Sequence, residues 1–161
     1  MGSPASIMGH PIHPMLIPFP IALWVFSLVG DLIYLRGGNP VWEWVAFYTL
    51  AGGIVGALLS AVFGIIDYFG IKDRKASSIA AWHARINVLA LLIFAGSFYL
   101  RTTGGSGLVN RSLTIPVALS VVGVILITIS GWLGGELVFK HGVAVSPQDT
   151  GGEAKGKAGV A

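Results

Sequence analysis

The chain has 161 residues, of which 54% are apolar and only 11% charged, and its net charge is +3. Soluble domains carry about 25% charged residues, so this composition excludes an ordinary soluble domain and predicts an integral membrane protein. The sequence holds no cysteine, which excludes disulfides, thiolate metal ligands, iron–sulfur clusters and thiol nucleophiles.

The first element in chain order is the motif HPIHP. Its two histidines, His10 and His13, each precede a proline, and Pro14 precedes a long apolar run. Proline disfavours helical backbone in the residue before it, so both histidines are expected in extended backbone. Pro14 can start a helix, and the two prolines that follow are expected to loosen or kink its first turns. Residues 1–14 are therefore predicted to form a stiff cytoplasmic lip, whose imidazoles can fold over the end of a helix bundle.

Four apolar stretches follow the motif. A transmembrane helix needs about 20 mostly apolar residues, and polar, glycine-rich segments separate the four stretches that qualify. Short connections predict an all-α, up-down-up-down bundle, with a four-helix transmembrane domain over residues 15–141 and a flexible cytoplasmic tail over residues 142–161. The predicted spans are 15–35, 41–69, 79–100 and 113–139.

The second span carries small residues at every fourth position. Gly52, Gly56, Ser60 and Gly64 form a small-xxx-small stripe. In membranes such stripes let another helix approach closely. The stripe therefore predicts the face on which this helix packs inside the bundle.

Basic residues predict the orientation. Seven of them lie on one side of the predicted bundle and three on the other. The positive-inside rule then places both termini in the cytoplasm. Their position in loops is typical of membrane topology and argues against a nucleic-acid partner. The seven are Lys72, Arg74, Lys75, Arg85, Lys140, Lys155 and Lys157, and the three are Arg36, Arg101 and Arg111.

Charged residues inside the spans are few and costly, so each is a functional hypothesis by default. Asp31, near the far end of the first span, is expected to pair with Arg36 or Arg101 or to cap a neighbouring helix, and a proton-relay role is the alternative. Two further carboxylates fall in the layer that holds every histidine of the chain. The members of this layer are His10, His13, Asp67, His83, Glu136 and His141.

One interpretation of this layer is a b-type cytochrome, because membrane heme is commonly held by axial histidines. His83 and His141 are the preferred axial pair, since they belong to separate helices that meet at one face. His10 or His13 could replace either ligand. Arg85 would stand at the interface to neutralise the heme propionates.

A second interpretation is a non-heme metal site. The four histidines, with Asp67 and Glu136, supply enough nitrogen and oxygen ligands for one or two ions of iron, copper or zinc. The carboxylates could instead orient the imidazole rings. Either cofactor would make the chain an electron-transfer or metal-binding protein, with a redox partner or other membrane subunits beside it.

The alternative from another class is a structural subunit of a respiratory or photosynthetic membrane complex, without a cofactor of its own. A four-helix chain with almost no soluble portion has little room for a complete reaction. Nucleophile-elbow, phosphate-loop and metalloprotease patterns are also missing from the sequence. An enzyme that acts alone on a soluble substrate is therefore the least favoured interpretation.

Four motifs carry a resemblance to a known family: HPIHPMLIPFPIALWVFSLVGDL, GIIDY, AWHARIN and GWLGGELVFKHGVAV. Over residues 9–145 the chain resembles the bacterial membrane domain-of-unknown-function family numbered 2231. The resemblance implies four spans in a bacterial inner membrane and supports the six layer residues as motif positions, but it gives them no roles. Some family members look fused to Rieske-type iron–sulfur domains, which hints at electron transfer.

Overall fold

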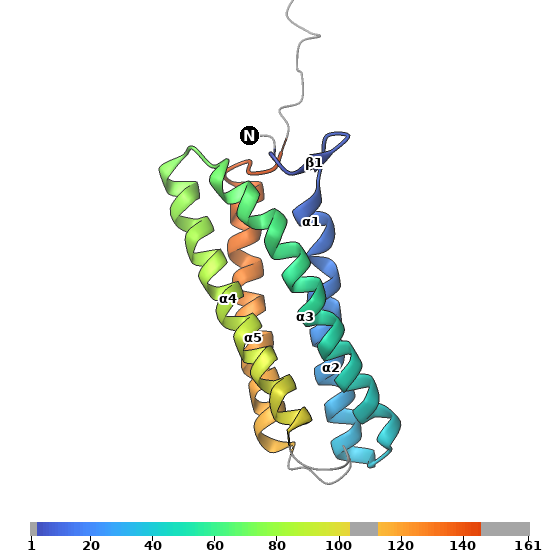
Figure 1. Ribbon diagram of the computed structural model, residues 1–161. Coiled ribbons are helices and arrows are strands. Elements are labelled where there is room, and N and C mark those ends of the chain that lie inside the picture. The colour runs from blue at the N-terminus through green and yellow to red at the C-terminus, as the bar shows by residue number, and fades with distance from the viewer. Residues whose placement is uncertain (1–2, 104–112, 146–161) are drawn as a thin grey trace, which may run out of the picture.

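The computed structural model describes residues 3–103 and 113–145 (Figure 1). A short antiparallel hairpin precedes helices that run up and down in turn along one bundle. The prediction of an all-α, up-down-up-down membrane bundle is confirmed. The strands are β1 (Ser6–Ile7) and β2 (His10–Pro11), and the helices are α1 (Ile12–Leu16), α2 (Pro18–Gly37), α3 (Pro40–Phe69), α4 (Arg74–Thr102) and α5 (Thr114–Phe139).

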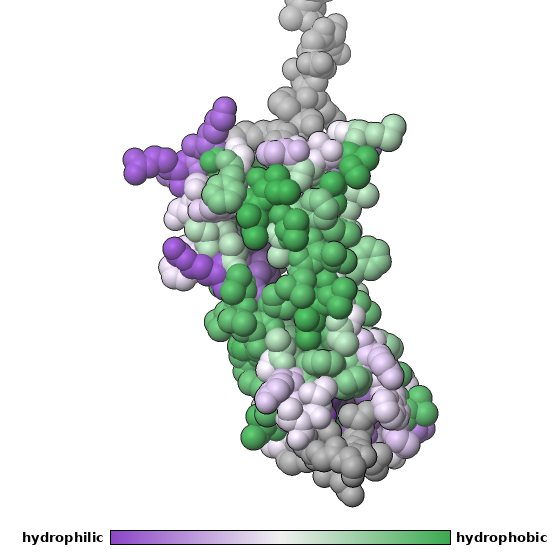
Figure 2. Space-filling view, in the orientation of Figure 1, coloured by the Kyte–Doolittle hydropathy of each residue, from purple (hydrophilic) through white to green (hydrophobic). Residues whose placement is uncertain are grey.

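In the part of the chain that the structure describes, four helical stretches are long and apolar enough to cross a membrane, and α1 with α2 forms the first of them. Figure 2 shows a hydrophobic band between two more hydrophilic ends of the bundle. Large apolar side chains stand exposed on the helices, among them Val62 and Leu92. A bilayer covers such a surface favourably. Residues 146–161 of the predicted tail lie outside the described residues.

The start of the first helix differs from the prediction at one histidine. α1 begins at Ile12, so His13 lies in helical backbone, and the prediction of extended backbone was wrong for it. Pro14 is tolerated here because the N–H groups of a first helical turn lack intrahelical partners anyway. The helix is interrupted at Ile17, directly before Pro18, although Ile17 keeps helical dihedral angles.

Capping residues set two other helix boundaries. α4 begins at Arg74, more than one turn before the predicted start of the third span, because the Asp73 carboxylate accepts a hydrogen bond from the backbone N–H of Ala76 at 2.7 Å. Such N-caps stabilise a helix start even where the sequence around it is polar. At the opposite end of the bundle, Gly38 ends α2 with φ +66° and Asn39 caps α3.

In the bundle α2 packs against α3, and α4 packs against α5. Aromatic stacking between α2 and α4 fills the centre. Trp24 of α2 and Phe94 of α4 stack with ring centroids 4.1 Å apart. Ala90, Phe94 and Ser97 are fully buried, so the prediction that this face of the third span points inward is confirmed. Leu50 and Ile127 complete this core.

The small-residue stripe of α3 faces α1 and α2, as predicted. A Cβ added at Gly56 would meet the Pro20 ring at 3.4 Å, and one added at Gly64 would meet the His13 ring at 2.7 Å. The absence of side chains at these positions therefore lets the first span lie directly on α3. This close approach brings His13 into the bundle.

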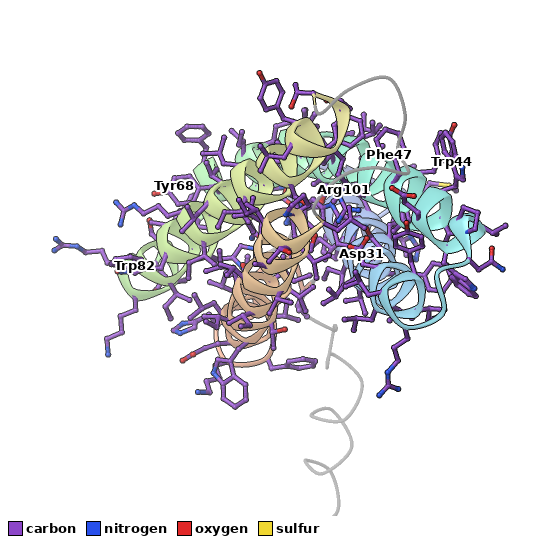
Figure 3. All side chains as sticks on the ribbon, turned by 90° about the horizontal axis from the view of Figure 1, so that it is seen from below. Asp31, Trp44, Phe47, Tyr68, Trp82 and Arg101 are labelled. Atoms are coloured by element: carbon purple, nitrogen blue, oxygen red, sulfur yellow. The ribbon has the colours of Figure 1, made fainter. Side chains whose placement is uncertain are left out.

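A buried ion pair ties the far ends of α2 and α4 together. The Arg101 guanidinium donates to both carboxylate oxygens of Asp31, at 2.7 and 2.6 Å, and the two side chains are 2% and 0% exposed. Figure 3 shows the two side chains converging between the helices. One of the partners expected for Asp31 is thus confirmed.

Candidate functional site

The four histidines lie at one end of the bundle, the end that carries the β1–β2 hairpin (Figure 1). His10 is exposed in β2, where its Nδ1 lies 3.1 Å from the carbonyl oxygen of Met8. His141 lies just after the end of α5. The other two, His13 and His83, are partly buried, and their rings contact α3 and α5, respectively.

His13 is held by α3. Its Nδ1 lies 2.8 Å from the carbonyl oxygen of Ser60 and 3.1 Å from the Ser60 hydroxyl. The ring covers Gly64, one turn further along α3, where an added Cβ would lie within 3.2 Å of three ring atoms. A serine carbonyl and a bare glycine backbone therefore fix the position of this imidazole.

His83 is held by α5 in the same way. Its Nδ1 lies 2.9 Å from both the carbonyl oxygen and the hydroxyl of Ser130. The ring lies against Gly134, one turn further along α5, where an added Cβ would meet Cε1 at 3.2 Å. In each case the serine follows its histidine by 47 residues. One arrangement of histidine, serine and glycine therefore occurs twice in the chain.

These contacts determine the tautomer of both rings. A carbonyl oxygen only accepts, so in the neutral rings of His13 and His83 the proton lies on Nδ1 and Nε2 keeps its lone pair. In His83 this lone pair accepts a hydrogen bond from the Asn87 amide at 3.0 Å. The equivalent position in the first half is Ile17, whose aliphatic side chain cannot donate. The two rings are thus similarly anchored but differ at Nε2.

The predicted carboxylates have other partners. Asp67 accepts hydrogen bonds from the Ser3 hydroxyl at 2.5 Å and from the backbone N–H of Ala5 at 3.2 Å. It therefore fastens the N-terminal segment across the end of the bundle. Glu136 pairs with Lys140 at 3.2 Å in an exposed i,i+4 bridge, which is worth little free energy.

Arg85 lies outside the bundle. Its guanidinium stacks over the ring of Trp82 at 5.2 Å, and that ring is itself exposed. Figure 3 shows Trp82 on the outer side of α4. The residue thus lies at the surface of the histidine end, and its interaction with propionates stays a prediction.

Over residues 3–103 and 113–145, no group of three or more His, Asp or Glu side chains is gathered closely enough to hold a metal ion. The structure anchors two of the six predicted ligands, His13 and His83, to neighbouring helices, and the ligand roles of all six stay predictions. The serine partners, Ser60 and Ser130, were missed. The signal that could have found them is the repeated spacing of 47 residues from histidine to serine.

Fold and site together define a four-span membrane protein with two histidines that are anchored to neighbouring helices. A family model described as "Predicted membrane protein (DUF2231)" matches residues 9–147, and the chain belongs to this family. No curated protein and no solved structure matches the chain.

Proposed function

We propose that this membrane protein binds a redox cofactor between its helices, with His13 and His83 as the ligands. The cofactor is a b-type heme or an iron or copper ion, whereas zinc, the third candidate metal, would make a metal site without electron transfer. The observation that carries the proposal is the pair of partly buried imidazoles, each with Nδ1 anchored to a serine carbonyl. A bound heme or redox-active metal would supply one-electron transfer.

The anchoring fits what ligand histidines require. Histidines that bind metals almost always donate their second ring N–H to a carbonyl or carboxylate, which fixes the tautomer and the ring orientation. Ser60 and Ser130 provide such carbonyls. Because the two histidines belong to different helices, a cofactor bound by both would also link the two helical hairpins.

The remaining predicted residues have roles other than primary ligation in this proposal. His10 and His141 lie at the same end and are candidates for replacing a ligand. Asp67 orders the N-terminal segment that leads to His13, and Glu136 belongs to the surface. Arg85 is close enough to the membrane boundary to meet an anionic group, either a propionate or a lipid phosphate.

The test is metal analysis of the purified protein together with an absorption spectrum in oxidised and reduced forms. A Soret band with split α and β bands on reduction would identify heme. A colourless protein that carries a stoichiometric transition metal would identify the metal site. A protein that holds neither, and takes up neither when they are added, would contradict the proposal and favour the structural-subunit alternative.

Asn87 provides a sharper test, because its amide occupies the lone pair that a ligand would need. Asn87→Ile places at this position the residue found at the equivalent position of the first half. One hydrogen bond is worth about 0.5–1.5 kcal/mol net, so freeing Nε2 should raise the affinity for metal or heme by about 2–10-fold. Titration by absorbance or calorimetry measures the change.

The control for Asn87→Ile is the same substitution in a His83→Ala background. No gain in affinity is expected there, because the nitrogen that the substitution frees is missing. An equal gain in both backgrounds would show that Asn87 acts on something other than His83.

We further propose that the protein lies in a bacterial inner membrane with both termini in the cytoplasm, beside a redox partner or other subunits. The seven-to-three distribution of basic residues supports this orientation. Reporters fused to the C-terminus and between α4 and α5 should report cytoplasm and periplasm, respectively. The opposite pattern would reverse the orientation, and the histidine end would then face the periplasm.

A further inference from the structure

The two histidine sites belong to a longer internal repeat, whose offset along the chain also relates other contacts in the bundle. Ser27 of α2 donates its hydroxyl proton to the carbonyl oxygen of Ala46 at 2.7 Å. Ser97 of α4 donates to the carbonyl oxygen of Pro116 at 2.9 Å. In the sequence, the two donors, Ser27 and Ser97, are separated by as many residues as the two acceptors, Ala46 and Pro116. The contact between α2 and α3 is thus reproduced between α4 and α5.

The central aromatic rings pack on glycines in both hairpins, and the same sequence offset relates these two contacts. The Trp24 ring covers Gly53 of α3, where an added Cβ would clash with the indole. The Phe94 ring covers Gly123 of α5, where an added Cβ would meet the ring at 2.6 Å. The separation between ring and glycine along the chain is the same in both hairpins.

Contacts between the hairpins join equivalent positions. Asp31 pairs with Arg101, and these two residues are 70 residues apart in the sequence. The same separation holds for Trp24 stacked on Phe94. It is also the offset that relates the two histidine sites. An interface in which a position meets its own equivalent is the property of a twofold axis.

We infer that residues 12–70 and 82–140 are two copies of one helical hairpin unit, and that each copy presents a self-complementary face whose partner is the other copy. Because α2 and α4 both run away from the histidine end (Figure 1), the two copies are parallel and their pseudo-twofold axis runs along the bundle. Two layers lie on this axis, the aromatic stack and the ion pair. This inference does not depend on any cofactor.

The axis layers give a direct test, because residues at equivalent positions should be exchangeable across the axis in the full chain. One exchange combines Trp24→Phe with Phe94→Trp. The other combines Asp31→Arg with Arg101→Asp. After the second exchange the new guanidinium would meet Ser27, just as Arg101 donates to Ser97 at 3.5 Å.

Each single substitution is expected to lower the unfolding midpoint in detergent, and each completed exchange to recover most of that loss. The control combines Trp24→Leu with Leu50→Trp, which keeps the composition of the core but joins positions that the repeat does not relate, and no recovery is expected there. Failure of both axis exchanges to recover more than the control would overturn the inference.

A milder pair of variants keeps the test decisive if an exchange variant does not fold. Ser27→Ala and Ser97→Ala remove the equivalent hydrogen bonds to α3 and α5, so both should lower the unfolding midpoint, and Ser97→Ala should lower it more because Ser97 also contacts Ser120 and Arg101. A loss in one variant alone would count against two equivalent units. A loss in both, together with recovery in the aromatic exchange, would support them.

Discussion

Removing either charge of the Asp31–Arg101 pair should destabilise the bundle by about 3–5 kcal/mol, because it leaves the other charge buried without its partner. Both side chains are almost completely buried, and two short hydrogen bonds join them. Asp31→Leu and Arg101→Leu test the two sides of the pair by thermal unfolding in detergent. The double variant should recover much of the loss, since replacing a whole buried ion pair by apolar residues is often close to neutral.

The control for the ion pair is Glu136→Gln. This change breaks the exposed bridge to Lys140, and surface bridges contribute about 0–1 kcal/mol. If Asp31→Leu cost no more than Glu136→Gln, the pair would not hold the helices together. A double variant as unstable as the two single variants combined would show that the two charges act independently.

The second large effect concerns the cofactor. His13→Ala and His83→Ala should each abolish most of the bound heme or metal, because each removes one ligand of a pair and the anchored partner cannot supply two bonds. His10→Ala and His141→Ala are the matched controls, since both residues lie at the same end of the bundle. They should keep most of the cofactor. Metal content and the absorption spectrum of each variant measure the occupancy.

Cofactor occupancy also distinguishes the proposed ligands, His13 and His83, from the pair that the sequence favoured, His83 and His141. If His141→Ala lost the cofactor and His13→Ala retained it, the ligands would be His83 and His141. Full occupancy in all four variants would remove histidine ligation from the proposal altogether.

The spans and the ion pair could be predicted because the physics behind them is visible in the sequence. A run of about 20 apolar residues is best accommodated by a bilayer, and Asp31 had few basic residues within reach. The early start of α4 was not predicted. Its first turns are polar, and the Asp73 cap that stabilises them is a single side-chain contact.

The anchoring of His13 and His83 could not be predicted from the topology alone, because the topology does not show which of four histidines at one end packs against a neighbouring helix. The choice is made by helix packing, in which Gly64 and Gly134 admit one ring each. The repeat behind this packing was also missed. Its contacts join side chains that differ in identity, such as Trp24 with Phe94, so similarity between the halves is weak.

The most direct measurement of the histidine pair is nitrogen-15 NMR in lipid bilayers. His10 and His141 are replaced by glutamine, so that only two imidazoles remain, and spectra are recorded without cofactor at mildly alkaline pH. We expect both rings to carry the proton on Nδ1 and the lone pair on Nε2, and added heme or metal to move the Nε2 signals. A proton on Nε2 of either ring would contradict the proposed ligation by His13 and His83. Nε2 signals that shift with neither heme nor metal would contradict it as well.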